Sequence, residues 1–172
     1  MGFGSAFKLL VDDRLDSTPA KYVGADELLE VRSAVVDLDL FAAAVCAVPL
    51  LDMVRYHRFL IARYWIPEYG DPDVPEEFAW LWDYSPYHRV RPGVEYPSVL
   101  FTVFESDSRV DPNHARKMCA ALQHATSSDP TKHPVLLRRE TEVGHAGRSV
   151  SRSVGLAVDQ LTFLARATGL EL

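Results

Sequence analysis

An aspartate and a histidine each follow an apolar segment in the second half of this chain of 172 residues. Asp107 lies in ESDSRVDP, after the run PSVLFTVF, and His145 lies between two glycines in EVGHAG, after HPVLLRRE. A carboxylate that fixes the tautomer of an imidazole and stabilises its charged form is the acid–base half of a Ser-His-Asp hydrolase. Glycines beside the histidine let its loop approach other groups without steric conflict. The order of these two residues therefore suggests general-base catalysis.

Both residues also have a structural interpretation. An aspartate after a strand is often a helix N-cap or a turn former, and a histidine between glycines is often an ordinary loop residue. Spacing alone favours these structural interpretations.

The segments around the two residues predict an α/β protein with a parallel sheet flanked by helices. Apolar runs over 41–52 and 97–106 predict central strands, and 133–145 predicts a strand nearer the sheet edge. Residues 112–125 and 150–170 have helical periodicity. Parallel neighbours need a crossover long enough to hold a helix, and ligands bind beyond the carboxyl ends of such strands. Asp107 and His145 both follow such ends.

Each predicted helix has an apolar stripe expected to face the core. The stripes comprise Ala115, Met118, Cys119 and Leu122 in the first helix, and Val150, Val154, Ala157, Leu161 and Leu164 in the second. Gly169 is the expected stop of the second helix.

The rest of the chain is less regular. Residues 53–88 are rich in aromatic residues and broken by prolines, which predicts short helices that interrupt the sheet. In the first forty residues, SAFKLLVDDRL and ADELLEVRSAVV are compatible with short amphipathic helices. The sequence pattern therefore leaves the structure of the first forty residues undetermined.

Composition excludes several classes of protein. The net charge is −6 with scattered basic residues, which argues against nucleic acid as a partner. We find neither a secretory signal nor an apolar run long enough for a membrane span, so we expect a cytoplasmic protein without membrane contact. Cys46 and Cys119 lie in apolar contexts without metal or redox spacing, which predicts buried thiols. We expect no metal and no cofactor.

From about Asp39 onward the chain resembles the C-terminal part of the catalytic domain of the prolyl oligopeptidase family of serine peptidases. The matching stretches are VPLLDMVRYHRF, YWIPEYGDP, YSPYHRV, YPSVLFTVFESDSRVDPNHARKMCAALQ and EVGHAG, in the family's order. This resemblance implies a partial α/β-hydrolase fold, with the N-terminal half of the domain and the propeller missing. It also divides the chain into a poorly matched segment 1–38 and a unit 39–172 that corresponds to the C-terminal part of the catalytic domain.

The resemblance also implies a role for five residues in hydrolysis after proline in short peptides. Asp107 would be the triad acid and His145 the base, while Arg109 would bind a substrate carbonyl. Trp65 would stack on the proline ring, and Val110 would line the apolar pocket around it. Trp65 could instead be an ordinary core aromatic, and Arg109 a surface ion-pair former.

The family's nucleophile, a serine in GGSNGG, has no counterpart here. Matching its paired leucines to Leu28 and Leu29 places the nucleophile near Gly24, and neither Ser17 nor Ser33 lies in G-x-S-x-G. We expect the isolated chain to be inactive, as a fragment of a longer protein or as one half of a pair completed by a catalytic-domain partner.

Other interpretations stay open at this point. The chain could be a non-catalytic relative that binds proline-containing peptides or a partner protein, or, less in keeping with YWIPEYG and SDSRV, an esterase or dipeptidyl peptidase. A sheet cut through its middle would also expose a strand edge, which invites self-association.

Overall fold

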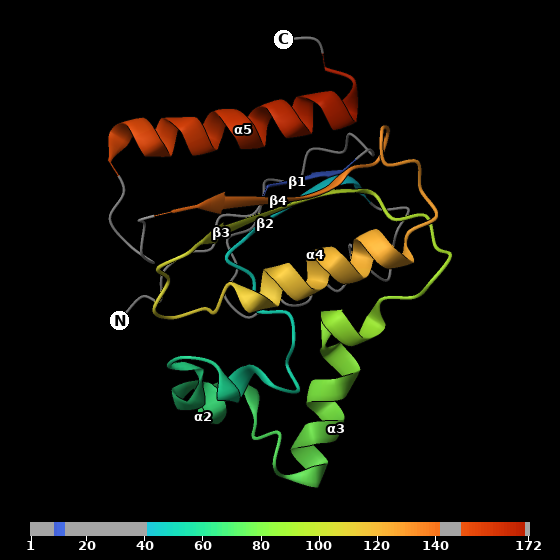
Figure 1. The fold of residues 1–172 in the computed structure, drawn as a ribbon. Helices are drawn as coiled ribbons and strands as arrows, with labels where there is room; N and C mark the ends of the chain where they lie inside the picture. Colours follow the sequence, from blue (N-terminus) through green and yellow to red (C-terminus); the bar gives the residue numbers. More distant parts are fainter. Residues whose placement is uncertain (1–8, 13–40, 142–148, 171–172) are drawn as a thin grey trace.

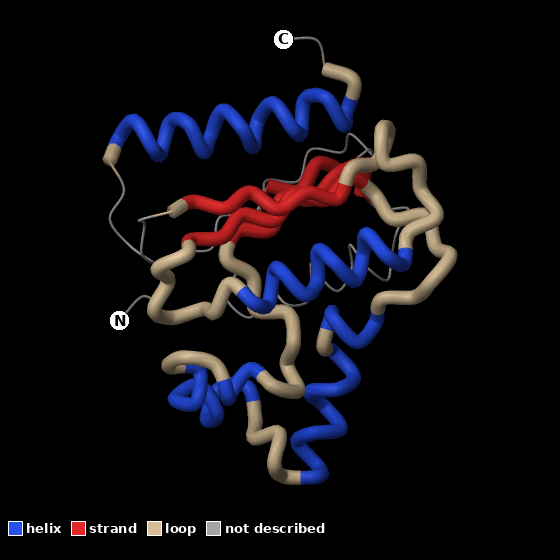
Figure 2. The backbone as a smooth tube through the Cα atoms, in the orientation of Figure 1, coloured by secondary structure: helices blue, strands red, loops and turns tan. Residues whose placement is uncertain are grey.

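The computed structural model describes residues 9–12, 41–141 and 149–170. A four-stranded sheet in the order β1-β2-β3-β4 lies between two helices, with α5 over one face and α4 over the other (Figures 1 and 2). The strands are β1 (Leu9–Asp12), β2 (Phe41–Ala47), β3 (Ser98–Phe104) and β4 (Val135–Glu140). The two covering helices are α4 (Asn113–Ala125) and α5 (Val150–Thr168).

The sheet is parallel except at one edge. β3 pairs in parallel with both β2 and β4, while β1 pairs antiparallel with β2. The prediction of two central strands and a third nearer the edge is confirmed. β2 ends at Ala47, earlier than the apolar run predicts, because Val48 adopts a positive φ of 50° and Pro49 follows it.

Alternate residues of the strands point to opposite faces of the sheet, and both faces are buried. On the α4 side, Ala44, Phe101 and Val103 pack in one cluster with the helix. On the α5 side, Ala43, Val45 and Leu100 pack with Leu164. Burial on both faces explains why β2 and β3 are continuously apolar. Cys46 of β2 and Cys119 of α4 lie in the cluster between the sheet and α4, and both are buried, as predicted.

The helices confirm one predicted stripe and overturn the other. All four stripe residues of α4, from Ala115 to Leu122, are buried. In α5 the predicted stripe faces away from the sheet: Val150 is 81% exposed and Leu161 57%, and only Leu164 is buried. α5 carries apolar residues on more than one side, so its sequence does not determine which side faces the sheet. In the structure the side with Leu156 and Leu164 packs on the strands. Gly169 ends α5 with a left-handed φ of 71°, as predicted.

Residues 53–88, predicted to form short helices with irregular links, do so, and the last of these helices extends to Arg89. These are η2 (Tyr56–Arg58), η3 (Ala62–Trp65), α2 (Ile66–Tyr69), α3 (Pro75–Tyr84) and η4 (Pro86–Arg89). They form their own core around Tyr56 and Leu81, on the α4 side of the sheet (Figure 1).

The prediction of a helix over SAFKLLVDDRL is wrong where it can be compared, because Leu9–Asp12 forms strand β1. Pairing with the backbone of β2 outweighs the weak local preference for a helix. The second predicted helix, residues 25–36, and the division at residue 38 lie outside the described residues. Among the described helices, none has the length and apolar character needed to span a bilayer.

Candidate active site

Asp107 lies in the loop that follows β3 and is buried, with 6% of its surface exposed. Its backbone N–H donates to the Phe104 carbonyl at 3.2 Å. Its Oδ1 accepts hydrogen bonds from the N–H groups of Arg109 at 2.7 Å and Val110 at 3.0 Å. Asp107 therefore forms the turn that its structural interpretation predicts. The same bonds fix the direction in which the carboxylate points, which a triad acid also requires.

The start of this loop is held by an ion-pair cluster. Both carboxylate oxygens of Glu105 accept from Arg116 of α4, at 2.7 and 2.6 Å, and Oε1 also accepts from Arg139 of β4 at 2.6 Å. Hydrogen bonds from Arg116 and then Arg139 lower the pKa of Glu105, so its carboxylate stays charged. The cluster joins the residue two before Asp107 to a helix and to the neighbouring strand.

The loops after β3 and β4 begin side by side. Phe104 is the register partner of Glu140, and the Glu105 N–H donates to the Glu140 carbonyl at 3.0 Å. His145 follows Glu140 by five positions and lies outside the described residues. The approach of His145 to Asp107 therefore stays a prediction.

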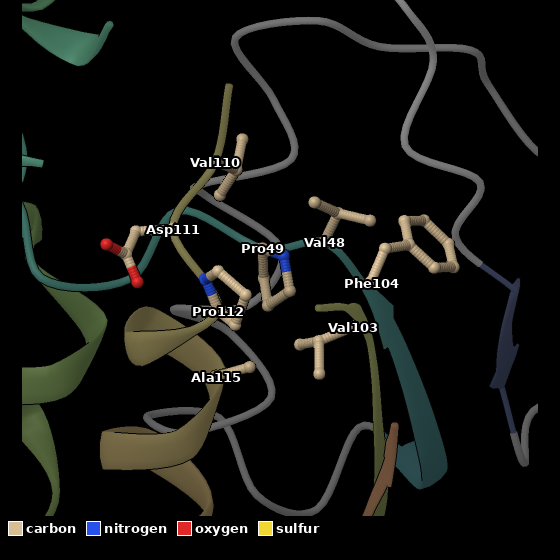
Figure 3. Close-up of a pocket in the computed structure, with 8 residues that line it drawn as sticks. All are labelled: Val48, Pro49, Val103, Phe104, Val110, Asp111, Pro112 and Ala115. Atoms are coloured by element: carbon tan, nitrogen blue, oxygen red, sulfur yellow. The ribbon is translucent and has the colours of Figure 1, made fainter. Parts of the chain in front are cut away.

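Arg109 and Val110 lie in the same loop as Asp107 but in different surroundings. Arg109 is exposed, so its guanidinium is accessible from solvent. Val110 is partly buried and lines a small pocket near the ends of β2 and β3 (Figure 3). The pocket has a volume of about 160 Å³, open solvent included, and is lined by Val48, Pro49, Val103, Phe104, Val110, Asp111, Pro112 and Ala115. It is smaller than a typical ligand site.

Backbone strain marks the wall of this pocket opposite Val110. Val48 has a φ of 50°, a conformation that β-branched residues rarely adopt, and its N–H donates to the Thr102 carbonyl at 2.9 Å. Such strain persists only where the surrounding structure enforces it, and it is frequent at functional sites.

Trp65 lies at the end of η3, in the core of the short helices. It is partly buried, packs against the cluster of Met53, Tyr56, Ala62 and Leu81, and meets the Tyr69 ring edge-on at 6.5 Å between centroids. This packing is what its interpretation as a core aromatic predicts. Leu50, which follows the strained turn after β2, packs against the same cluster. The segment after β2 therefore contributes to both places: Val48 and Pro49 line the pocket with Val110, and Leu50 packs against the cluster that contains Trp65.

A buried carboxylate joins this segment to α4. Asp52 is 1% exposed, pairs with Lys117 and with Arg55 at 3.2 Å, and has its Oδ1 4.0 Å from Nε2 of His88. Burial acts to raise the pKa of Asp52, but Lys117 and the other cations outweigh it and lower the pKa. The Nδ1 atom of His114 accepts from the Asp52 N–H at 3.1 Å, and burial lowers the pKa of His114 to about 4. His114 is therefore neutral at pH 7.

Ser85, His88 and Asp52 together resemble a second Ser-His-Asp set. Ser85 Oγ lies 2.8 Å from His88 Nδ1. However, Ser85 is fully buried and its Oγ also accepts from the Met53 N–H at 3.0 Å. A nucleophile must reach its substrate, so this set holds the short helices to the sheet and does not catalyse.

Sequence reasoning identified neither Asp52 nor the Glu105 cluster. Asp52 and Lys117 are 65 positions apart, and Glu105 meets residues of two other elements. No local spacing signals such contacts. An aspartate inside the apolar run 41–52 was the one available hint, because a buried carboxylate needs a partner.

Comparisons of this sequence with family models and with known proteins all point to the same family. The model of the prolyl oligopeptidase family matches residues 31–171. A dual function macrocyclase-peptidase from Galerina marginata is 40% identical over 134 residues, which are 77% of this chain and 18% of that protein. A prolyl endopeptidase from Elizabethkingia miricola is 39% identical over 135 residues, or 77% of this chain and 19% of that protein.

Solved structures agree with the family match. Prolyl oligopeptidase B from Galerina marginata, bound to a 35mer hydrolysis and macrocyclization substrate, matches with a TM-score of 0.78 and 39% identity, over 85% of this chain and 20% of that chain. A post-proline cleaving enzyme from Rickettsia typhi matches with a TM-score of 0.74 and 30% identity, again over 85% and 20%. The predicted partial α/β-hydrolase fold is thereby confirmed. This chain spans about a fifth of the length of these relatives.

Proposed function

Because this chain belongs to the prolyl oligopeptidase family, we propose that it provides the acid–base half of a serine peptidase that cleaves after proline in short peptides. The observation that carries the proposal is the placement of Asp107. Its carboxylate is buried beyond the carboxyl end of β3, is oriented by two loop amides, and lies in a loop that begins beside the end of β4. His145 follows that end.

In this proposal His145 accepts the proton of the attacking hydroxyl and later returns it to the leaving amine. Asp107 orients the imidazole and stabilises its charged form. The exposed donors of Arg109 suit a substrate carbonyl, and the apolar surfaces of Val110 and Trp65 suit the ring of proline. The relative from Galerina marginata that was solved with a 35mer substrate supports a peptide as the ligand.

In this proposal the nucleophile comes from outside these 172 residues, either from an upstream part of a longer chain or from a second polypeptide. The sequence contains no G-x-S-x-G, and Ser85, whose Oγ lies 2.8 Å from His88 Nδ1, is buried. Catalytic groups of a triad act as a unit, so the isolated chain should have little or no activity. A second candidate function, a peptide-binding relative without catalysis, is favoured by the same absence of a serine elbow.

One experiment separates the two functions. The chain is titrated with a Gly-Pro chromogenic peptide, while NMR follows the Val110 methyl groups and the Trp65 indole, and cleavage is assayed in parallel. We expect both signals to shift without cleavage and without labelling by a fluorophosphonate probe. Co-expression with the serine-bearing remainder of a relative's catalytic domain should then restore cleavage, and His145→Ala should abolish it.

The other outcomes are equally informative. Peptide binding that never leads to cleavage, even in an isolated complex of the two polypeptides, would favour the non-catalytic function. Strong labelling of the isolated chain would refute the absence of a nucleophile. Unchanged Val110 and Trp65 signals would remove the proposed proline site.

A further inference from the structure

Strand β1 comes from outside the part of the chain that matches the family. The family model begins at residue 31, whereas β1 consists of Leu9–Asp12. It is also the antiparallel member of an otherwise parallel sheet. A strand that precedes the matched residues therefore pairs with the edge of β2, which lies within them (Figure 1).

The covered edge belongs to a strand that is buried on both faces. Ala43 and Ala44 are fully buried, Val45 and Cys46 nearly so, and the strand packs toward α4 on one side and toward α5 on the other. Strands of this kind occupy the interior of parallel sheets and have neighbours at both edges. Without β1, the backbone N–H and C=O groups on this edge of β2 would lose their partners, and such an edge is a template for another strand.

The pairing of β1 with β2 is irregular. The described residues Leu9–Asp12 pair with β2 between Phe41 and Val45, with a register shift between Val11 and Asp12. On the other edge, β3 pairs with β2 from Ala43 to Ala47. A strand without the register shift could therefore form a more regular ladder with β2 than Leu9–Asp12 does.

We infer that β1 is a substitute edge strand, which occupies the surface of β2 where a strand of the serine-bearing polypeptide would otherwise pair. The inference rests on the proposed function, because that polypeptide is the occupant to which it commits. Relatives about four times as long as this chain contain ample sequence for such a strand. β1 and that strand exclude each other, so β1 both protects the isolated chain from association and competes with assembly.

The test uses the full chain with Leu10→Pro and Val11→Pro together. Proline cannot donate to a β ladder, so the double substitution removes a donor from β1 whichever of the two residues faces β2. The matched control, Leu10→Ala with Val11→Ala, keeps both N–H groups. We expect β2 amides to exchange at least about tenfold faster in the proline variant, and its mass by light scattering to increase through association. The alanine variant should stay monomeric.

Two further measurements keep the inference falsifiable without depending on activity. In the unmodified chain, NMR should show backbone contacts between the register partners Leu10 and Ala44. On co-expression with the serine-bearing remainder of a relative's catalytic domain, more of the proline variant than of the alanine variant should be recovered in complex. Absence of the Leu10–Ala44 contact, unchanged exchange in β2, or equal recovery of the two variants would overturn the inference. A complex that forms and does not cleave would instead count against the proposed function.

Discussion

Arg116 donates from one guanidinium nitrogen to both carboxylate oxygens of Glu105, at 2.7 and 2.6 Å. This contact ties the first half of α4 to the end of β3, two residues before Asp107. Two kinds of contact thus hold the loop of the candidate acid. The ion pair connects it to α4, and hydrogen bonds from the Arg109 and Val110 N–H groups to Asp107 Oδ1 close it on itself.

Arg116→Gln should loosen this loop. We expect the amides of Arg109 and Val110 to exchange severalfold faster, because their hydrogen bonds to Asp107 depend on the position of the loop. Arg139→Gln is the matched control: it removes a single bond from a side chain that is 54% exposed, so its effect should be smaller. Equal exchange in both variants and in the unmodified chain would show that Glu105 does not hold the loop.

His114 should make the free energy of unfolding depend on pH. Burial lowers its pKa from 6.5 to about 4, so the unfolded chain binds a proton in this range that the folded chain does not. Its contribution is complete above pH 6.5 and is lost as the pH falls toward 4. The difference between the two pKa values corresponds to about 3 kcal/mol.

Urea unfolding at a series of pH values measures this contribution. His114→Asn should flatten the dependence between pH 6.5 and 4, because an amide oxygen can still accept from the Asp52 N–H but does not titrate in this range. His124→Asn, at an exposed position of α4, should leave the slope unchanged. The same slope in both variants would show that His114 is not the group responsible.

Asp52→Asn should destabilise the fold strongly. The substitution removes the counter-charge of Lys117 and Arg55 and weakens charge-assisted hydrogen bonds to a buried oxygen; since these cations are 28% and 51% exposed, we expect a cost of about 1.5 to 3 kcal/mol. Asp83→Asn is the matched control, since Asp83 pairs with Arg89 but is 73% exposed and should cost less than about 1 kcal/mol. Similar unfolding free energies for the two variants would contradict the role of Asp52 as a buried link.

The orientation of α5 can be tested with two leucines three positions apart. Leu164→Ala removes a side chain from the core beside Ala43 and Leu100, and should cost about 2 to 4 kcal/mol of unfolding free energy. Leu161→Ala, at a position 57% exposed, should change it by less than about 0.5 kcal/mol. The reverse order in denaturant unfolding would contradict this orientation of α5.

These elements show what the sequence could and could not predict. The apolar runs located β2, β3 and β4, because strands buried on both faces have few polar residues. The predicted stripe of α5 was wrong because the helix is apolar on two sides. Tertiary packing alone determines that Leu164 is buried and Leu161 is exposed. β1 was misassigned since its partner, β2, lies more than thirty positions away, beyond any local pattern.

The candidate site was predictable to a similar extent. The position of Asp107 after a buried strand followed from the pattern, whereas the roles proposed for Arg109, Val110 and Trp65 rest on family resemblance and stay predictions. The ion pairs that hold the site, around Glu105 and Asp52, depend on the approach of separate elements. Residues that meet in this way belong to separate elements of the chain, so no local sequence pattern predicts their contact.

The central claim is that Asp107 and His145 form a hydrogen-bonded pair, and proton NMR of the imidazole tests it most directly. We predict a strongly downfield Nδ1 proton that disappears in His145→Gln and moves upfield in Asp107→Asn, where the loop amides keep an oxygen acceptor but the charge is gone. An imidazole spectrum that Asp107→Asn leaves unchanged, while the Arg109 and Val110 amides stay protected, would contradict the claim.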